Sequence, residues 1–209
     1  IGEEMEDWQL WLYTDSDFAS DKTDSKSVSG IFMAIGGVTT YFPISAQSKK
    51  QTSVSHSTCE AEIVAADAGL RCEALPTMTL YDTICQRAIS LIFLEDNQAT
   101  LRILQTGKYP TLGHVRRTHR INVAWCTEQC RQSCICLAAC ESHQMAADIF
   151  TKAFANVDKW IEVCKLIGTA SPSVWAEVFG RKKTSESRTS KTKETKKKIK
   201  KTEDWNLSL

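Results

Sequence analysis

Residues 91–94 form a short run, Leu-Ile-Phe-Leu, in which every side chain is apolar. A run of this length with no polar side predicts a strand that is buried on both faces of a sheet. Glu95 and Asp96 follow directly, and an apolar pattern with helical spacing then runs over 99–104 until Gly107 ends it. A buried strand that leads straight into a helix predicts a layered fold with helices packed on a sheet.

Three more strands are predicted before this point. Residues 8–13 carry Trp, Leu and Tyr side chains and predict a strand that ends in an acidic segment beginning at Asp15. Residues 31–35 and 38–42 flank Gly36-Gly37, a pair that supplies the positive φ of a tight turn, so they are predicted to form a β-hairpin. The simplest arrangement is three neighbouring antiparallel strands.

The rest of the chain alternates between helices and strands. Ser57 and Glu60 have the spacing of a capping box, and residues 61–75 contain no proline before Pro76, which predicts a long helix that ends there. The later elements are predicted as a helix over 114–129, a buried strand over 135–139, a helix capped by Ser142 and an amphipathic helix over 157–166. Together they predict an α/β fold with a mixed five-stranded sheet, three antiparallel strands then two parallel ones, and helices on both faces.

The net charge of +1 conceals two parts of opposite sign. Residues 181–209 contain 11 Lys and Arg against 4 Asp and Glu (+7), so the other 180 residues carry 15 against 21 (−6). We predict a folded domain over 1–168, a connecting segment over 169–180 and a disordered basic tail over 181–209, which suits a nucleic-acid contact, a nuclear address or a solubilising extension. An acidic body indicates carboxylates grouped to hold cations rather than general adhesion to nucleic acid.

Other features indicate the setting of the chain. No apolar run approaches the roughly 18 to 20 residues that cross a bilayer, and no secretory signal is evident, so we expect an intracellular protein with no membrane contact, in a cytoplasmic particle or the nucleus. The start at Ile1, with no initiator methionine, is expected of a piece of a longer polypeptide. Nine cysteines, an odd number, are typical of thiols in a reducing compartment. The cysteines between 126 and 140 lack the paired spacing of a zinc site, which favours buried thiols.

Four carboxylates stand where such a sheet would gather them. Asp15 follows the first strand, Asp96 follows the fourth, Glu62 lies in the long helix and Asp148 lies in the helix after the fifth strand. Adjacent carboxylates repel one another unless cations neutralise them, and Mg²⁺ prefers hard oxygen ligands. We therefore expect two Mg²⁺ ions, for which Mn²⁺ can substitute, although any single acidic residue is more simply explained as solvated surface.

Five short motifs make this expectation more specific. They are Tyr13-Thr14-Asp15-Ser16-Asp17-Phe18-Ala19, Lys26-Ser27-Val28-Ser29-Gly30, Ser57-Thr58-Cys59-Glu60-Ala61-Glu62, Glu95-Asp96-Asn97-Gln98-Ala99 and Ala147-Asp148-Ile149-Phe150-Thr151-Lys152. In order and spacing they resemble the ribonuclease H region of copia-type retrotransposon polyproteins, over most of residues 8–168. The resemblance implies a ribonuclease H fold, a divalent-metal nuclease, and an origin downstream of a reverse transcriptase domain.

The resemblance also assigns roles to single residues. It implies that Asp15, Glu62, Asp96 and Asp148 are the catalytic metal ligands, with Asp15 and Asp96 shared by both ions. Glu60 is explained instead by capping, since at the third helical position it can reach back to the backbone of Ser57. Residues predicted to bind substrate are Ser16, Asn97, Arg116, Arg117 and His119.

Two of these substrate assignments have competing explanations. The amide of Asn97 could read the 2′-hydroxyl that distinguishes RNA from DNA, but helix capping competes for it. The cluster of His114, Arg116, Arg117, His119 and Arg120 suits phosphate contact and equally a solvated helix face. The family usually has Pro-Thr-Glu-Asp-Gln before the last aspartate, and residues 139–144 of this chain depart from it.

The function implied is endonucleolytic, Mg²⁺-dependent hydrolysis of the RNA strand of RNA/DNA hybrids during retrotransposon reverse transcription. Its partners would be the hybrid and the reverse transcriptase domain of the same polyprotein. The altered segment before Asp148 keeps open an alternative, a catalytically inactive domain of the same fold that only binds nucleic acid or acts as a structural connection. Another two-metal nuclease of this fold, such as an integrase, is less favoured by the motifs around Asp96 and Asp148.

Overall fold

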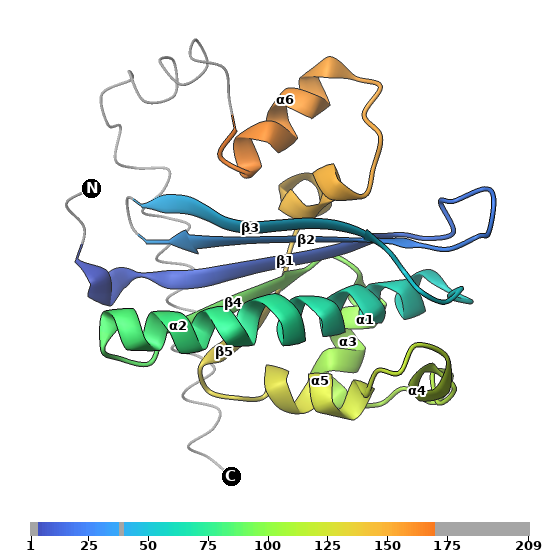
Figure 1. Cartoon of the computed structure of the whole chain (residues 1–209), viewed down its shortest axis with the longest axis horizontal. Coiled ribbons are helices and arrows are strands. Elements are labelled where there is room, and N and C mark those ends of the chain that lie inside the picture. The colour runs from blue at the N-terminus through green and yellow to red at the C-terminus, as the bar shows by residue number, and fades with distance from the viewer. Residues whose placement is uncertain (1–3, 38–39, 170–209) are drawn as a thin grey trace.

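The apolar run at 91–94 forms β4 (Ser90–Glu95), which lies beside β1 (Gln9–Asp17) in a five-stranded sheet (Figure 1). The other strands are β2 (Val28–Gly36), β3 (Tyr41–Lys50) and β5 (Ile135–Ala139), and the order across the sheet is β3-β2-β1-β4-β5. The first three strands are antiparallel, and β1, β4 and β5 are parallel. This confirms the predicted α/β fold with a mixed five-stranded sheet of three antiparallel strands followed by two parallel ones.

The computed structural model describes residues 4–37 and 40–169, so the predicted connecting segment from residue 170 on and the predicted basic tail lie outside the described residues. The helices are α1 (Thr58–Ala68), α2 (Leu75–Cys85), α3 (Gln98–Thr106), α4 (Val115–Thr118), α5 (Val123–Cys130) and α6 (Val157–Leu166), with short turns at η1 (Met5–Asp7), η2 (Gly69–Ala74), η3 (Ser142–Gln144) and η4 (Ala146–Phe150). None of the described helices is long and apolar enough to cross a membrane.

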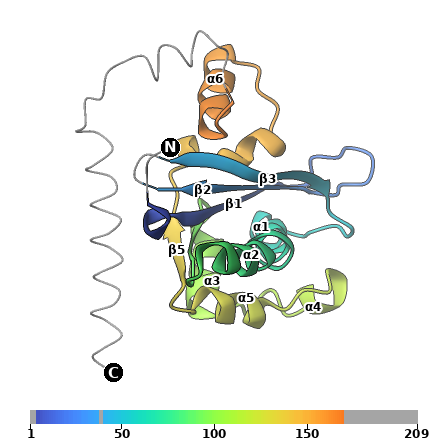
Figure 2. The same ribbon diagram turned by 60° about the vertical axis from the view of Figure 1, so that its left-hand side comes forward.

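The two faces of the sheet are buried by different elements. Helices α1, α2, α3 and α5 cover one face, and α6 lies over the other (Figure 2). The larger core lies on the α1 side and contains Leu10, Leu12 and Ile63. A smaller core on the opposite side packs Tyr13 and Phe32 against the residues around η4. The alternation of side chains along β1 sends its even-numbered residues to α1 and its odd-numbered residues toward η4.

Polar caps fix where four of the helices begin. The side chains of Ser57, Asn97, Asn122 and Asn156 accept hydrogen bonds from backbone N–H groups at the starts of α1, α3, α5 and α6. The strand β5 and the bounds of α6 match the predictions. All nine cysteines lie in the described part of the chain and are free. Cys126 is buried, Cys72 is exposed and the rest are half-buried, so the prediction of mostly buried thiols was too strong.

Two predicted helix boundaries were wrong. The helical path continues through Pro76, because η2 is a π turn in which Leu75 N–H donates to Leu70 O and the missing N–H of proline is accommodated. The single helix predicted over 114–129 is broken between α4 and α5. Arg120 there has a φ of 58°, in the left-handed region, which no helix of L-residues continues through.

Three other local predictions also need correction. Gly36 belongs to β2 and pairs with Tyr41, and the chain reverses between Gly37 and Thr40, whose backbone groups bond at 2.9 Å. The first strand does not end before the acidic segment but continues through it to Asp17. Ser142 makes no side-chain capping bond, and Asp148 lies in the 3₁₀ turn η4 instead of an α-helix.

Candidate active site

Asp15 and Asp96 are brought together by the register of two central strands. The last parallel pair between β1 and β4 is Tyr13 with Leu94, and each aspartate lies two residues beyond it. Because neighbouring strands lie about 5 Å apart, the two carboxylates come out side by side where β4 ends. Asp15 itself lies inside β1, opposite Gly30 of β2, and only 2% of its surface is exposed.

Glu62 reaches the same place from α1. It is 3% exposed, and its Oε2 atom is buried without a hydrogen-bond partner in the described part of the chain. Burial raises the pKa of Glu62 to about 10, and the charges of Glu95, Asp15 and Asp96 add to the rise. The hydroxyl of Ser16 opposes it slightly, but no donor lies in hydrogen-bonding geometry to Oε2. A buried carboxylate oxygen without a donor is costly unless a cation or proton takes it.

Asp148 approaches from η4 on the other face of the sheet. Burial raises its pKa to about 6, with contributions from Asp15 and Asp96, although Lys152 acts in the opposite direction. Lys152 Nζ lies 2.6 Å from Asp148 Oδ1 and 3.3 Å from Asp15 Oδ1, and the hydroxyl of Thr151 donates to Asp15 Oδ2. Asp15 and Asp96 therefore lie close enough to both Glu62 and Asp148 to raise the pKa values of those two carboxyls.

A fifth carboxylate, Glu95, was not predicted to belong here. It is fully buried at the end of β4, where Oε2 accepts from Thr14 Oγ1 at 3.3 Å and Oε1 accepts from Asn97 N–H at 3.1 Å. Burial, followed by the charges of Asp96 and Asp15, raises its pKa to about 8 against the lowering effect of these two bonds. The signal was present in the sequence, because Glu95 continues the alternation of Leu91 and Phe93 and so points to the α1 side.

The donor set suits a divalent cation of the Mg²⁺ type. Every group is a carboxylate oxygen, and Glu62 Oε2 has no competing partner. Among the described residues, however, no three His, Cys, Asp or Glu side chains already lie close enough to hold one ion. The chemistry of the donors therefore fits the group, but the carboxylates would have to move closer together to hold it.

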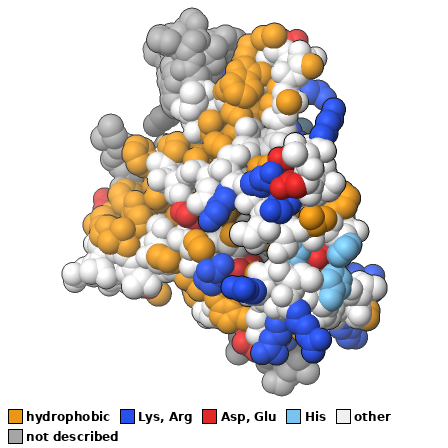
Figure 3. Space-filling view, turned by 45° about the vertical axis from the view of Figure 1, so that its right-hand side comes forward, with side chains coloured by type: hydrophobic (Ala, Val, Ile, Leu, Met, Phe, Trp, Pro, Cys, Tyr) orange, Lys and Arg blue, Asp and Glu red, His pale blue; other side chains and the backbone are white. Residues whose placement is uncertain are grey.

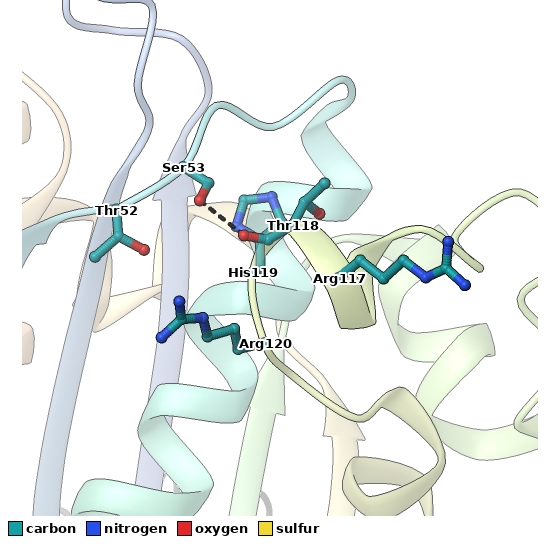
Figure 4. Close-up of a pocket in the computed structure, with 6 residues that line it drawn as sticks. All are labelled: Thr52, Ser53, Arg117, Thr118, His119 and Arg120. Atoms are coloured by element: carbon teal, nitrogen blue, oxygen red, sulfur yellow. Dashed lines mark hydrogen bonds between the residues drawn. The ribbon is translucent and has the colours of Figure 1, made fainter.

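A second polar region adjoins the start of α1. Thr52, Ser53, Arg117, Thr118, His119 and Arg120 line a pocket of about 490 Å³, in which Ser53 Oγ donates to Thr118 O at 2.8 Å (Figure 4). The predicted substrate residues Arg116 and Arg117 are exposed, as is Arg120. Figure 3 shows Lys and Arg side chains in several groups on the face that also carries histidines.

His119 lies differently from the phosphate contact predicted for it. Its side chain is 1% exposed, and its Nε2 lies 2.9 Å from Glu60 Oε1. Glu60 also accepts from His114 at 3.2 Å and from His56 N–H at 3.0 Å. Burial opposes the ionisation of Glu60, but these bonds outweigh it and lower the pKa of this carboxyl. Glu60 therefore ties the α4 segment to α1, and the arginines of that segment remain exposed.

Glu60 and Asn97 both lie at the start of a helix, where capping was predicted. Glu60 N–H donates to Ser57 Oγ as a capping box requires, but the glutamate side chain accepts from His56 N–H rather than from Ser57. Asn97 Oδ1 caps α3 by accepting from Ala99 and Thr100, which is the competing explanation for this residue. Ser16 Oγ is buried close to Glu62 and has no hydrogen-bond partner among the described residues.

No protein-family model matches the chain, and a comparison with curated proteins found no match either. Among solved structures, the chain is similar to a ribonuclease H1 isolated from compost by a metagenomic approach, with a TM-score of 0.45 and 17% identity over 68% of this chain and 92% of that one. That enzyme has also been solved in complex with an RNA/DNA hybrid.

Two further solved structures are also similar. For the ribonuclease H1 of the archaeon Halobacterium salinarum the TM-score is 0.46, with 11% identity over 68% of this chain and 94% of that one. For the protease-reverse transcriptase of prototype foamy virus the TM-score is 0.36, with 12% identity over 80% of this chain and 21% of that one. These likenesses are distant, so a function has to be argued from the chain's own residues.

Proposed function

We propose that this chain is a Mg²⁺-dependent endonuclease that hydrolyses the RNA strand of RNA/DNA hybrids, acting with a reverse transcriptase domain of the same retrotransposon polyprotein. The observation that carries the proposal is that Asp15 and Asp96 lie near both Glu62 and Asp148, and that the buried Oε2 of Glu62 has no donor among the described residues. Buried acids whose pKa is raised by burial and by neighbouring carboxylates, as for Glu62 and Asp148, are a common mark of a site that holds cations or moves protons. The resemblance in the five motifs supplies the substrate class.

Each residue has a role that follows from where it lies. Asp15 and Asp96, on adjacent strands, would be shared by two Mg²⁺ ions, while Glu62 and Asp148 would each complete one from opposite faces of the sheet. When bound, the ions would supply an activated water and stabilise the departing 3′ oxygen. The burial of Asp15 and Glu62 excludes bulk water and so strengthens their hold on a cation.

The basic segment after α4 would position the hybrid. Arg117 and Arg120 line the pocket beside the start of α1, and guanidinium groups pair well with phosphate oxygens. Such contacts fix the register of a duplex without reading its sequence. His119 would act indirectly, since its bond to Glu60 holds this segment against the helix that carries Glu62.

The test is cleavage of a labelled RNA/DNA hybrid by the purified chain in the presence of Mg²⁺. We expect the RNA strand to be cut and duplex DNA to be spared, and we expect Asp96→Asn to lower the rate by about 100-fold or more, because it weakens a ligand shared by both ions. Asp158→Asn, at an exposed position in α6, is the matched control and should cut like the unchanged chain. Retained cleavage in Asp96→Asn would refute the assignment.

A second candidate function is supported by the absence of any ready-made three-ligand metal site among the described residues. In that case the domain would bind nucleic acid without cutting it. Hybrid binding with no cleavage at any Mg²⁺ or Mn²⁺ concentration would favour this alternative.

A further inference from the structure

Lys152 occupies the space between two of the proposed metal ligands. Its ammonium group lies 2.6 Å from Asp148 Oδ1 and 3.3 Å from Asp15 Oδ1, so one cation bridges carboxylates from η4 and β1. The hydroxyl of Thr151 takes the other oxygen of Asp15. Both oxygens of Asp15 are thus engaged by the two residues that follow η4.

The backbone makes this arrangement possible. Gly30 faces η4 from β2, and a Cβ atom there would lie 2.8 Å from Ala147 O and 2.6 Å from Thr151 Cγ2. Because Gly30 has no side chain, η4 packs directly on the sheet opposite Asp15. Lys152 lies four residues after Asp148, and its ammonium group contacts both Asp148 and Asp15 of β1.

The bridge differs from a permanent buried ion pair. Asp15 is buried, but 40% of the Lys152 side chain is exposed, so its flexible stem can swing into solvent without leaving a buried ammonium group behind. The Oδ1 atoms of Asp15 and Asp148 could then be released together by the departure of a single side chain.

We propose that Lys152 is a resident counter-ion that occupies the cation position between Asp15 and Asp148 and must leave before a divalent ion can bridge them. This inference rests on the proposed function. It makes Lys152 a positioning residue that stabilises the metal-free protein and weakens its affinity for the ion. Removal of the ammonium group should therefore strengthen Mg²⁺ binding, whereas a residue that helped to hold the ions would have the opposite effect.

The experiment measures Mg²⁺ binding to the 209-residue chain by isothermal titration calorimetry, and thermal unfolding with EDTA or with Mg²⁺. We expect Lys152→Met to lower the Kd for Mg²⁺ by about tenfold, as removal of one nearby competing charge predicts. We also expect this variant to unfold at a lower temperature in EDTA and to gain more from Mg²⁺ than the unchanged chain. Lys152→Arg, which keeps the charge, should resemble the unchanged chain.

Lys159→Met is the matched control, since it removes the same charge from an exposed position in α6 and should change neither measurement. Equal or weaker Mg²⁺ binding by Lys152→Met than by the unchanged chain would overturn the inference while leaving the proposed nuclease function in place. If neither protein binds Mg²⁺ or Mn²⁺ at millimolar concentrations, the proposed function fails and the inference fails with it. If Lys159→Met gained as much affinity for Mg²⁺ as Lys152→Met, the effect would come from net charge alone, and the inference would also be overturned.

Discussion

Glu60 and Glu62 lie two residues apart on α1, and both are buried, but their surroundings differ. Glu60 accepts bonds from two histidines and a backbone N–H, and its pKa is lowered. Glu62 has no donor on Oε2 among the residues that the structure describes, it faces other carboxylates, and burial raises its pKa to about 10. One glutamate is thus satisfied by the protein, and the other is left for a cation or a proton.

Glu62→Gln should therefore stabilise the metal-free protein. The pKa of Glu62 rises from about 4.5 to about 10 on folding, so between these values the folded state holds a proton that the unfolded state lacks. The free energy of unfolding of the unchanged chain then falls as pH rises through this window. The variant does not lose this stability, because glutamine does not ionise. We expect the free energy of unfolding of the variant to exceed that of the unchanged chain by about 1 to 3 kcal/mol at pH 8 and by little at pH 4.

Denaturant unfolding in EDTA between pH 4 and pH 9 measures this difference. Glu162→Gln, at an exposed position in α6, is the control and should give a constant offset. Excess Mg²⁺ should reduce or reverse the advantage of Glu62→Gln, because a bound ion stabilises the ionised glutamate. Parallel stability curves for Glu62→Gln and the unchanged chain would show that Glu62 is not held protonated.

The sequence separated these two glutamates because capping is a local rule. Ser57 and Glu60 lie within one helical turn, and the bond from Glu60 N–H to Ser57 Oγ was predictable from spacing alone. The histidine partners of Glu60 come from a segment more than 50 residues away, and the carboxylates that surround Glu62 come from β1 and from the end of β4. No spacing rule gives such contacts, and the bridging position of Lys152 escaped prediction for the same reason.

At the scale of elements, Gly30 decides how closely η4 approaches the sheet. Gly30→Ala places a methyl group 2.8 Å from Ala147 O, a backbone atom that cannot turn aside, and 2.6 Å from Thr151 Cγ2. We expect η4 to be pushed off the sheet, with a loss of about 1 to 3 kcal/mol in the free energy of unfolding. Because η4 carries Asp148, Mg²⁺ affinity measured by calorimetry should fall at a temperature where the variant is still folded.

Gly113→Ala is the matched control, because a Cβ atom there would meet nothing within 4 Å. Its stability should stay within about 0.5 kcal/mol of the unchanged chain. If both substitutions changed the free energy of unfolding equally, the effect of Gly30→Ala would come from the flexibility of the unfolded chain and not from the contact between Gly30 and η4.

The elements show which parts of the fold the sequence could predict. The buried strand β4, its helix α3 and the helix α6 follow from periodicity and caps, and they were predicted correctly. The continuation past Pro76 and the break at Arg120 were missed. The first depends on a π turn, and the second on a left-handed arginine that directly follows His119, a partner of Glu60. Packing between distant segments overrides local preference at both positions.

For the whole molecule, an acidic region and a basic region both adjoin α1, which carries Glu62 and, at Glu60, the bonds to His114 and His119. The carboxylates gather where β4 ends, and the exposed arginines Arg116, Arg117 and Arg120 lie on and after α4. A hybrid whose scissile phosphate lies at the acids would meet repulsion there, and the arginines would have to supply the attraction. Binding should therefore depend strongly on salt and on this one segment.

The combined change of Arg117→Gln and Arg120→Gln should weaken hybrid binding most at low salt. If each arginine contacts one phosphate, the slope of log K against log salt concentration should become shallower by about 1 to 2. Fluorescence anisotropy of a labelled hybrid, titrated in the Asp96→Asn background to prevent cleavage, measures the slope. The control is the pair Lys159→Gln and Lys165→Gln in α6, which removes two charges from the opposite face of the sheet (Figures 1 and 2).

If the α6 pair shifts the slope as much as the arginine pair, attraction comes from net charge and the α4 segment has no special role. If the arginine pair lowers affinity with no change in slope, the arginines support the pocket without touching phosphate. A shallower slope for the arginine pair alone would locate the hybrid over α4 and the start of α1. From there the proposed cation site at the ends of β1 and β4 lies within reach of the same duplex, because α1 carries both Glu60 and Glu62.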